Sequence, residues 1–396
     1  MASSHSLRCV IGAPMGLPFR PMHLGIRNEQ SGNERRVAAT PTSVASFTDL
    51  GFVVSVETGA GIPAGFTDTA YTEAGASVVE DLRSGDSIDL LIKIAPPSES
   101  DRELMSASGV ILGLVDPTAN MDTLTAWGES GITSISMEMV PRTTLAQSMD
   151  VLSSQATSAG YAAVLLGVTK LPKFMPMLVT AAGTIPPANV LILGVGVAGL
   201  QAIATAKRLG AIVYAYDIRP ETKEQVESLG GRFVEAETQE MEEGGYARAV
   251  DEETAEKQRE ALASAVKDAD LIITTAQVPG RRAPRLIDRS MVEAMRPGSL
   301  IIDMAAASGG NVEGSAPDET VVVNDVTILG PTDLASRVAT DSSRMFGRNV
   351  LELVKRMVVD GELTVDHEDP VVGPAIVAPI SSPPEGANPS ESEASE

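Results

Sequence analysis

The sequence predicts an α/β protein with two doubly wound, parallel-sheet domains that are joined by a long helix and followed by a disordered C-terminal tail. Short aliphatic runs alternate with helical stretches along most of the 396 residues, which is typical of parallel sheets covered by helices. An alanine-rich helical stretch, Ser153 to Lys170, separates two such series. Residues 371–396 are rich in proline, serine and glutamate, so we expect them to be disordered.

The first series predicts a domain formed by residues 22–152. Its apolar runs lie in the segments HLGIRNE, FTDLGFVVSVETGAG, DLLIKIAPP, GVILGLVDP and GITSISMEMVP. Residues 338–370 are expected to join this domain, because the stretch from Thr340 to Val359 has the apolar spacing of an amphipathic helix. Residues 1–21 lack the continuous apolar region of a secretory signal, so we interpret them as an N-terminal extension.

The second series, residues 153–337, contains a nucleotide-binding pattern. An aliphatic run, VLIL, precedes a G-x-G-x-x-G spacing, and a helical pattern follows. In such a strand–turn–helix unit the first glycine permits the turn, the second lets the backbone approach a pyrophosphate, and the third lets the helix pack close to the strand. The pattern predicts a Rossmann-like fold whose cofactor-binding residues include Gly194, Gly196, Val197 and Gly199.

An acidic residue after the next strand indicates which dinucleotide the site prefers. Asp217 ends the apolar run that begins at Ala211, about 20 residues after the glycines, as the fingerprint requires. A carboxylate there accepts the hydroxyls of the adenosine ribose and repels a 2′-phosphate, which favours NAD(H) over NADP(H). Arg219 leaves the alternative open, because an arginine just past the strand can receive a 2′-phosphate.

A charged segment interrupts the second domain. Residues 235–256 are too charged for a strand and contain a Gly244–Gly245 break before Tyr246. We expect a solvent-facing loop, and a loop of that length in a compact domain is usually functional or disordered. Strands resume in DLIITTAQVPGR, GSLIIDMAA and VVVNDVTILG.

Composition excludes several classes of function. The formal net charge of −23 makes nucleic acid an unfavourable partner. The single Cys9 and the three histidines, His5, His23 and His367, argue against a disulfide framework and a metal site. No continuous run of about 18 apolar residues occurs, so we expect no direct insertion into a membrane.

Several long segments carry a more specific resemblance. They are PRTTLAQSMDVLSSQA (141–156), FMPMLVTAAGTIPPANVLILGVGVAGLQAIATAKRLGA (174–211), TKEQVESLGGRF (222–233), TTAQVPGRRAP (274–284) and SGGN (308–311). With these segments, the chain from about Met22 to Val359 resembles the NAD(H)-binding component, domain I or the alpha subunit, of proton-translocating nicotinamide nucleotide transhydrogenase. That family is related to alanine dehydrogenase.

The resemblance implies an activity and partners. In that family, NADH on this component passes hydride directly to NADP⁺ on a partner chain, and the exchange is coupled to proton translocation through a membrane-spanning subunit. It also implies a homodimer and a cytoplasmic, peripheral position at the inner face of the cytoplasmic membrane. Hydride exchange between two nicotinamide rings needs no general base, which agrees with the scarcity of histidine.

The resemblance also assigns residues at the nicotinamide end. Arg142, Asp150 and Ser153 match residues that orient the carboxamide, and Gln147 matches one that reaches towards the partner's nucleotide. Tyr246 matches the tyrosine of a mobile loop that closes over bound nucleotide. For Asp150 and Ser153 the residue types alone favour another interpretation, an ordinary helix N-cap.

Two other functions stay open at the sequence level. A soluble alanine dehydrogenase-like enzyme would need a proton acceptor, and the corresponding segment GVILGLVDPTANMD offers Asp116 and no histidine. Arg27 and Lys93 resemble the substrate-carboxylate ligands of such enzymes. A non-catalytic NAD-binding regulatory protein would keep the glycines and lose the nicotinamide-end residues, which are all present here.

Overall fold

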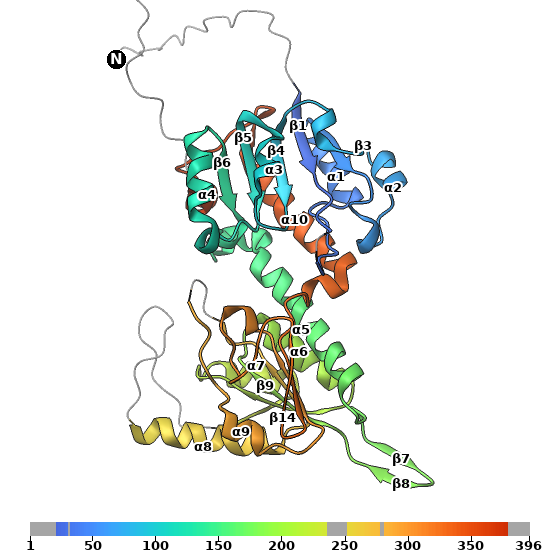
Figure 1. Ribbon diagram of the computed structural model, residues 1–396, viewed down its shortest axis with the longest axis vertical. Helices are drawn as coiled ribbons and strands as arrows, with labels where there is room; N and C mark the ends of the chain where they lie inside the picture. The colour runs from blue at the N-terminus through green and yellow to red at the C-terminus, as the bar shows by residue number, and fades with distance from the viewer. Residues whose placement is uncertain (1–20, 31, 236–251, 278–280, 379–396) are drawn as a thin grey trace, which may run out of the picture.

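The computed structural model describes residues 21–30, 32–235, 252–277 and 281–378. Figure 1 shows two α/β domains stacked along the long axis of the molecule, with one long helix running from the first into the second. This arrangement confirms the predicted fold class. Tyr246 and most of the charged segment around it lie outside the described residues.

The first domain is built on a sheet with the strand order β18-β6-β5-β4-β1-β2-β3. All neighbouring pairs are parallel except β18 with β6. Its strands are β1 (Met22–Ile26), β2 (Phe52–Glu57), β3 (Ser77–Val79), β4 (Ile88–Lys93), β5 (Met105–Gly113), β6 (Thr133–Ser136) and β18 (Ile376–Ala378). Its helices are α1 (Pro41–Asp49), α2 (Asp68–Glu73), α3 (Glu99–Arg102), α4 (Pro117–Glu129) and α11 (Val372–Ala375).

The second domain repeats this winding, with the strand order β11-β10-β9-β12-β13-β15-β14. Only the edge strand β14 is antiparallel to its neighbour. The strands are β9 (Asn189–Leu193), β10 (Ile212–Tyr216), β11 (Arg232–Phe233), β12 (Leu271–Thr274), β13 (Leu300–Asp303), β14 (Thr320–Val323) and β15 (Val326–Leu329). The helices are α6 (Val197–Arg208), α7 (Thr222–Ser228), α8 (Glu252–Asp268) and α9 (Arg289–Glu293).

The strand order defines where a ligand can bind in the second domain. From β9 the chain winds outward through β10 and β11, then crosses back to pair β12 on the other side of β9. Beyond the carboxyl ends of β9 and β12, successive connections leave the sheet in opposite directions. Open α/β sheets bind their ligands at such a switch point.

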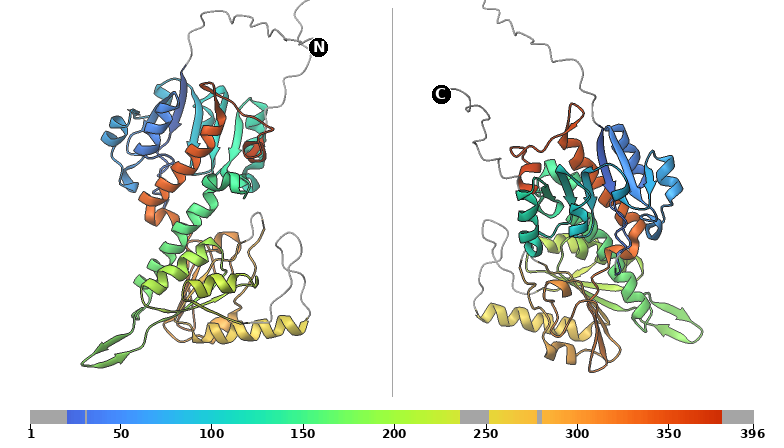
Figure 2. Two further views of the ribbon diagram at one scale, coloured as in Figure 1. Left: turned by 180° about the vertical axis from the view of Figure 1, so that it is seen from behind. Right: turned by 45° about the horizontal axis from the view of Figure 1, so that its top comes forward.

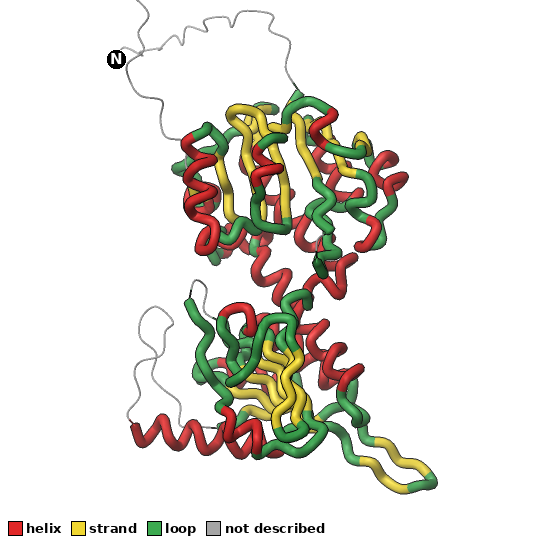
Figure 3. Tube along the Cα trace, in the orientation of Figure 1, coloured by secondary structure: helices red, strands yellow, loops and turns green. Residues whose placement is uncertain are grey.

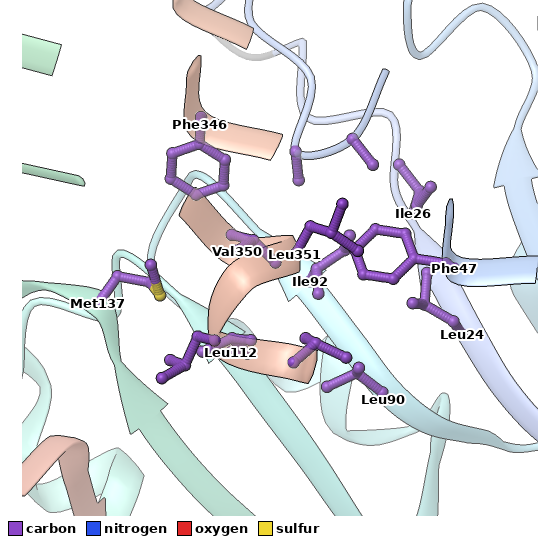
Figure 4. Close-up of a cluster of buried hydrophobic side chains, with 14 of the residues drawn as sticks. Leu24, Ile26, Phe47, Leu90, Ile92, Leu112, Met137, Phe346, Val350 and Leu351 are labelled. Carbon is purple, nitrogen blue, oxygen red and sulfur yellow. The ribbon is translucent and has the colours of Figure 1, made fainter. Parts of the chain in front are cut away.

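Two helices join the domains. α5 (Val151–Lys170) leaves the first domain and packs along α6 in the second, whereas α10 (Ala339–Met357) returns to the first and covers one face of its sheet. Figure 2 shows this return from behind. The apolar side of α10 contributes Phe346, Val350 and Leu351 to the first core, which the close-up in Figure 4 shows beside Ile92 and Leu112.

A two-stranded hairpin of the second domain projects from the molecule. It consists of β7 (Leu178–Thr180) and β8 (Gly183–Ile185), which pair with each other in antiparallel register. Figures 1 and 3 show it extending away from both domains. The sequence analysis did not predict it.

The structure corrects the predicted start of the tail. Residues 371–378 form α11 and β18, and Ile376 pairs with Ile135 at the edge of the first sheet. The prolines and serines that follow obscured the apolar run VVGPAIVA, in which Val371 and Val372 are fully buried. The first domain therefore extends beyond the predicted limit of residue 370.

Two further predictions need correction. The helix α8 begins at Glu252, so the last residues of the predicted charged loop are helical. Among the described residues, α5 is the one helix long and apolar enough to cross a membrane, by length and composition only. Its serines and threonines interrupt the apolar run and led the sequence prediction to overlook it. In the structure α5 packs against α6 and α10.

Candidate functional site

The three glycines after β9 have distinct structural reasons. Gly194 has a φ of 95°, in the region that favours glycine, and a Cβ on Gly199 would lie 2.0 Å from the carbonyl oxygen of Gly194. A Cβ on Gly196 would meet no atom within 4 Å. The first and third glycines are therefore needed by the fold, and the second leaves bare backbone facing open space.

This open backbone lies at the start of a helix. Gly196 is the N-cap of α6 and offers no side chain to its first N–H groups, and Val197 begins the helix half-exposed. A helix N-terminus with unpaired N–H groups attracts anions. The residues present therefore fit a dinucleotide pyrophosphate, as the spacing predicts.

Asp217 follows β10 and is buried beside this turn. One carboxylate oxygen accepts the backbone N–H of Val195 at 2.7 Å, and the other accepts the backbone N–H of Arg219 at 2.9 Å. The Arg219 side chain forms an ion pair with the same carboxylate, 2.9 Å from Nη2 to oxygen. Burial opposes the ionisation of Asp217, but these donors outweigh it and hold its pKa below the usual value.

Two polar side chains that the sequence analysis did not single out hold the loops after β12 and β13. Asn311 accepts the backbone N–H of Ala276 at 3.1 Å and donates to the carbonyl oxygens of Ala276 and Pro284, both at 2.8 Å. Thr275 donates to the carbonyl oxygen of Gly194 at 2.8 Å. These bonds fix the loops against the glycine turn.

Asp303 supports the same region from below. It is fully buried at the end of β13 and accepts bonds from the Thr274 hydroxyl at 2.9 Å and from the backbone N–H groups of Ala305 and Val312 at 3.0 and 3.1 Å. An acid that directly follows an aliphatic strand was the signal for it, as for Asp217. The sequence analysis applied that signal only once.

The predicted nicotinamide-end residues lie where α5 begins. The Asp150 carboxylate accepts the Ser153 backbone N–H at 2.9 Å and the Ser153 hydroxyl at 2.6 Å. The helix-cap interpretation is therefore confirmed as geometry. Arg142 and Gln147 are exposed on the segment just before, and Gln147 belongs to a short 3₁₀ helix, Thr144–Met149. The structure brings Asp150 and Ser153 together and leaves the other two side chains directed to solvent.

Asn349 on α10 holds this segment in place. Its side chain donates to the carbonyl oxygen of Ser148 at 2.7 Å and accepts the Ser154 hydroxyl at 2.6 Å. The two contacts lie on either side of Asp150. A second bond, from Gln155 to the carbonyl oxygen of Ser342, is 3.1 Å long. The first turn of α5 is therefore fixed by the helix that returns from the second domain.

The two regions of the candidate site are joined through α5 and α6. These helices cross so closely that a Cβ on Gly160 would lie 2.2 Å from the carbonyl oxygen of Ala198. Ala198 is in the first turn of α6, directly after the glycine turn. The Asp150 end and the glycine end thus belong to one rigid helix pair.

A separate ionic cluster lies at the carboxyl ends of the strands of the first domain. Asp101 is fully buried and accepts bonds from Lys93 at 2.5 Å and Arg27 at 2.7 Å. Glu57 lies 3.5 Å from Arg27, and Glu29 lies 4.0 Å from Lys93. The cationic groups of this cluster are therefore paired with carboxylates of the chain itself.

The winding order, the glycine turn and the acid after β10 together define a two-domain protein of the dinucleotide-binding Rossmann class. Comparison with known proteins is more specific. The family models described as the N-terminal and C-terminal domains of alanine dehydrogenase/PNT match residues 25–159 and 163–379. The chain therefore belongs to the alanine dehydrogenase/PNT family, as the quoted segments predict.

Its relatives include both branches of that family. The chain is 43% identical to an NAD(P) transhydrogenase subunit alpha polypeptide of Rickettsia prowazekii, over 86% of this chain and 91% of the relative. It is 29% identical to the alanine dehydrogenase of Bacillus subtilis, over 74% and 72% of the two chains. The solved structure of a transhydrogenase from Sinorhizobium meliloti matches with a TM-score of 0.83 and 39% identity, covering 90% of this chain and 98% of that one.

Proposed function

We propose that this chain is the NAD(H)-binding alpha subunit of a proton-translocating transhydrogenase. The observation that carries the proposal is the rigid link between two groups of residues. The glycine turn and Asp217 suit the pyrophosphate and the adenosine ribose, and the Arg142–Ser153 segment suits the nicotinamide end. The transhydrogenase relatives support this choice within the family.

In this proposal the residues of the chain bind and orient, and none transfers a proton. The N–H groups of Gly196 and the first turn of α6 hold the pyrophosphate, and Asp217 accepts the ribose hydroxyls. Arg142, Asp150 and Ser153 orient the carboxamide, so that one ring face is presented. NADH supplies the hydride, and closeness and orientation of the two rings provide the catalysis.

The second reactant is NADP⁺, held on a separate NADP(H)-binding subunit that approaches the exposed Gln147. A membrane-spanning subunit couples the exchange to proton translocation. The chain then works in the cytoplasm, at the inner face of the cytoplasmic membrane, through its partners and without inserting itself. The names of the relatives as alpha subunits support a complex of several chains.

The alanine dehydrogenase alternative is disfavoured by the ionic cluster of the first domain. Arg27 and Lys93 could hold a substrate carboxylate only if they were available, and both bind Asp101. With Glu29 and Glu57 nearby, the cluster has three carboxylates for two cations. An incoming carboxylate would meet no net positive charge. A non-catalytic regulatory role would leave the nicotinamide-end residues without a function.

A homodimer is also proposed, and the projecting hairpin is its supporting feature. Val179, Met177 and Phe174 are 74%, 59% and 55% exposed. The stretch from Phe174 to Ala206 contains no charged residue in a chain with a net charge of −23. Such an uncharged, apolar projection favours association with another apolar surface, and a second copy of the chain supplies an identical one.

The proposal is tested by following the reduction of an NAD⁺ analogue by NADPH. The purified chain is assayed alone and together with the NADP(H)-binding subunit, and L-alanine plus NAD⁺ is assayed in parallel. We expect turnover of the analogue only when the partner is present, and no turnover of alanine. Oxidation of alanine by the chain alone would overturn the proposal in favour of the dehydrogenase.

A further inference from the structure

The Asp217 carboxylate has no acceptor position left for a ribose hydroxyl. A carboxylate offers about four lone-pair positions. Among the described residues, four bonds reach it: Val195 N–H at 2.7 Å, Arg219 N–H at 2.9 Å, Arg219 Nε at 3.0 Å and Arg219 Nη2 at 2.9 Å. The oxygen that accepts from Val195 also accepts from Nη2, and the other oxygen accepts the remaining two. Asp217 is therefore saturated.

Only the guanidinium can release acceptor positions without moving the backbone. The donors of Val195 and of the Arg219 main chain belong to the turns after β9 and β10, whereas Nε and Nη2 belong to a side chain. That side chain is 37% exposed, and the Asp217 side chain is 7% exposed. Arg219 is thus the outer partner, and rotation of its side chain would expose two acceptor positions.

The guanidinium also reaches the glycine turn. Its Nη2 donates to the carbonyl oxygen of Val195 at 3.2 Å, between Gly194 and Gly196. The charge of Asp217 is neutralised at close range by a bidentate pair, the strong arrangement for arginine and carboxylate. A 2′-phosphate would then meet a cation at this position instead of an uncompensated carboxylate.

We propose that Arg219 determines how strongly the site discriminates between NADH and NADPH, by masking Asp217. The ribose hydroxyls of NADH compete with the guanidinium for the carboxylate, which weakens NADH binding. The same guanidinium pairs with the 2′-phosphate of NADPH once displaced, which reduces its rejection. The inference rests on the proposed NAD(H)-binding function and adds a residue that sets its selectivity.

Two substitutions test the proposal. Arg219→Met keeps the aliphatic length and removes the charge and both side-chain donors, whereas Arg219→Lys keeps the charge and loses the bidentate geometry. Dissociation constants for NADH and NADPH are measured by equilibrium titration of the purified chain. For Arg219→Met we expect NADH to bind more tightly and NADPH more weakly, so that the ratio of the NADPH constant to the NADH constant increases about tenfold. Arg219→Lys should fall between this variant and the wild type.

A double-mutant cycle separates masking from a structural role. If Arg219 acts through Asp217, Arg219→Met in an Asp217→Asn background should leave NADH affinity unchanged. A substitution that merely disturbs the turn would weaken NADH binding in both backgrounds. An unchanged or smaller NADPH/NADH ratio in Arg219→Met overturns the inference. A wild-type chain that binds neither nucleotide would instead overturn the proposed function, so the two failures are distinguishable.

Discussion

At the scale of the residue, one carboxylate serves the fold and the proposed site together. Asp150 caps α5 through Ser153, and the same pair is proposed to orient the carboxamide. Substituting either residue would therefore disturb the helix start as well as binding. Gln147 gives a cleaner test, because it is exposed and lies outside the cap.

Gln147→Asn shortens the side chain and keeps its amide. If Gln147 acts across the interface with the NADP(H)-binding subunit, the dissociation constant for NADH should stay within about twofold of the wild-type value. The rate of hydride transfer with the partner present should fall by roughly ten- to a hundredfold, since small misplacements of reacting groups are costly. Stopped-flow measurements give the rate and titration gives the constant. A parallel loss in both would make Gln147 an ordinary NADH ligand.

Glu29 links a buried residue to the pH dependence of stability. Burial raises its pKa to about 7, although Lys93 and the N–H groups of Ile94 and Ala95 oppose the shift. Between its unfolded pKa of about 4.5 and the folded value, the native state binds more protons than the unfolded state, so stability falls as pH rises through that window. The loss contributed by Glu29 is at most about 3 kcal/mol.

Glu29→Gln removes this titration and should flatten the decrease in the free energy of unfolding between about pH 5 and pH 7, by urea titration at each pH. Its absolute stability will be lower at every pH, because an amide cannot accept from both N–H groups that Glu29 binds. The test is therefore the slope. Parallel pH profiles for the two proteins would show that Glu29 stays ionised in the native state.

At the scale of the element, the crossing of α5 and α6 determines how the two ends of the site face each other. Replacing a glycine by alanine within a helix usually stabilises it by about 1 kcal/mol. At Gly160 the added methyl would lie against backbone atoms of Ala198, the nearest at 2.2 Å, so the helices must separate. Overpacking of this kind costs about 1–3 kcal/mol and exceeds the gain.

Gly160→Ala should therefore lower the midpoint of urea unfolding, and it should weaken NADH binding because α6 begins at the glycine turn. Thr169→Ala is the matched control, since Thr169 lies exposed near the far end of the same helix. We expect that control to leave NADH affinity unchanged. Stabilisation by Gly160→Ala, with unchanged affinity, would show that the helix pair does not position the site.

The elements differ in how well the sequence predicted them. The glycine turn, β10 and α10 were predictable, because their patterns depend on local geometry and on one buried face. The antiparallel strand β18 was not, since its stability comes from pairing with β6, far away in the chain. The loop contacts of Asn311 likewise join segments separated by about 30 residues, and only the folded chain brings them together.

At the scale of the whole molecule, net charge opposes self-association. Two copies with a formal charge of −23 each repel one another, so a dimer requires an apolar contact that compensates. The hairpin β7–β8 offers one, and Val179 is its most exposed large apolar side chain. A carboxylate introduced there would have to lose its hydration within the interface, at a cost of several kcal/mol.

Val179→Asp should therefore shift the chain from dimer to monomer at micromolar concentration, as measured by light scattering after size-exclusion chromatography. Val322→Asp adds the same charge at a valine of the edge strand β14 that is 62% exposed, so it controls for net charge alone and should stay dimeric. Because Val179 lies far out on the hairpin, the monomer should keep the NADH affinity of the wild type. A monomeric wild type, or equal dissociation in both variants, would show that the hairpin does not hold two copies together.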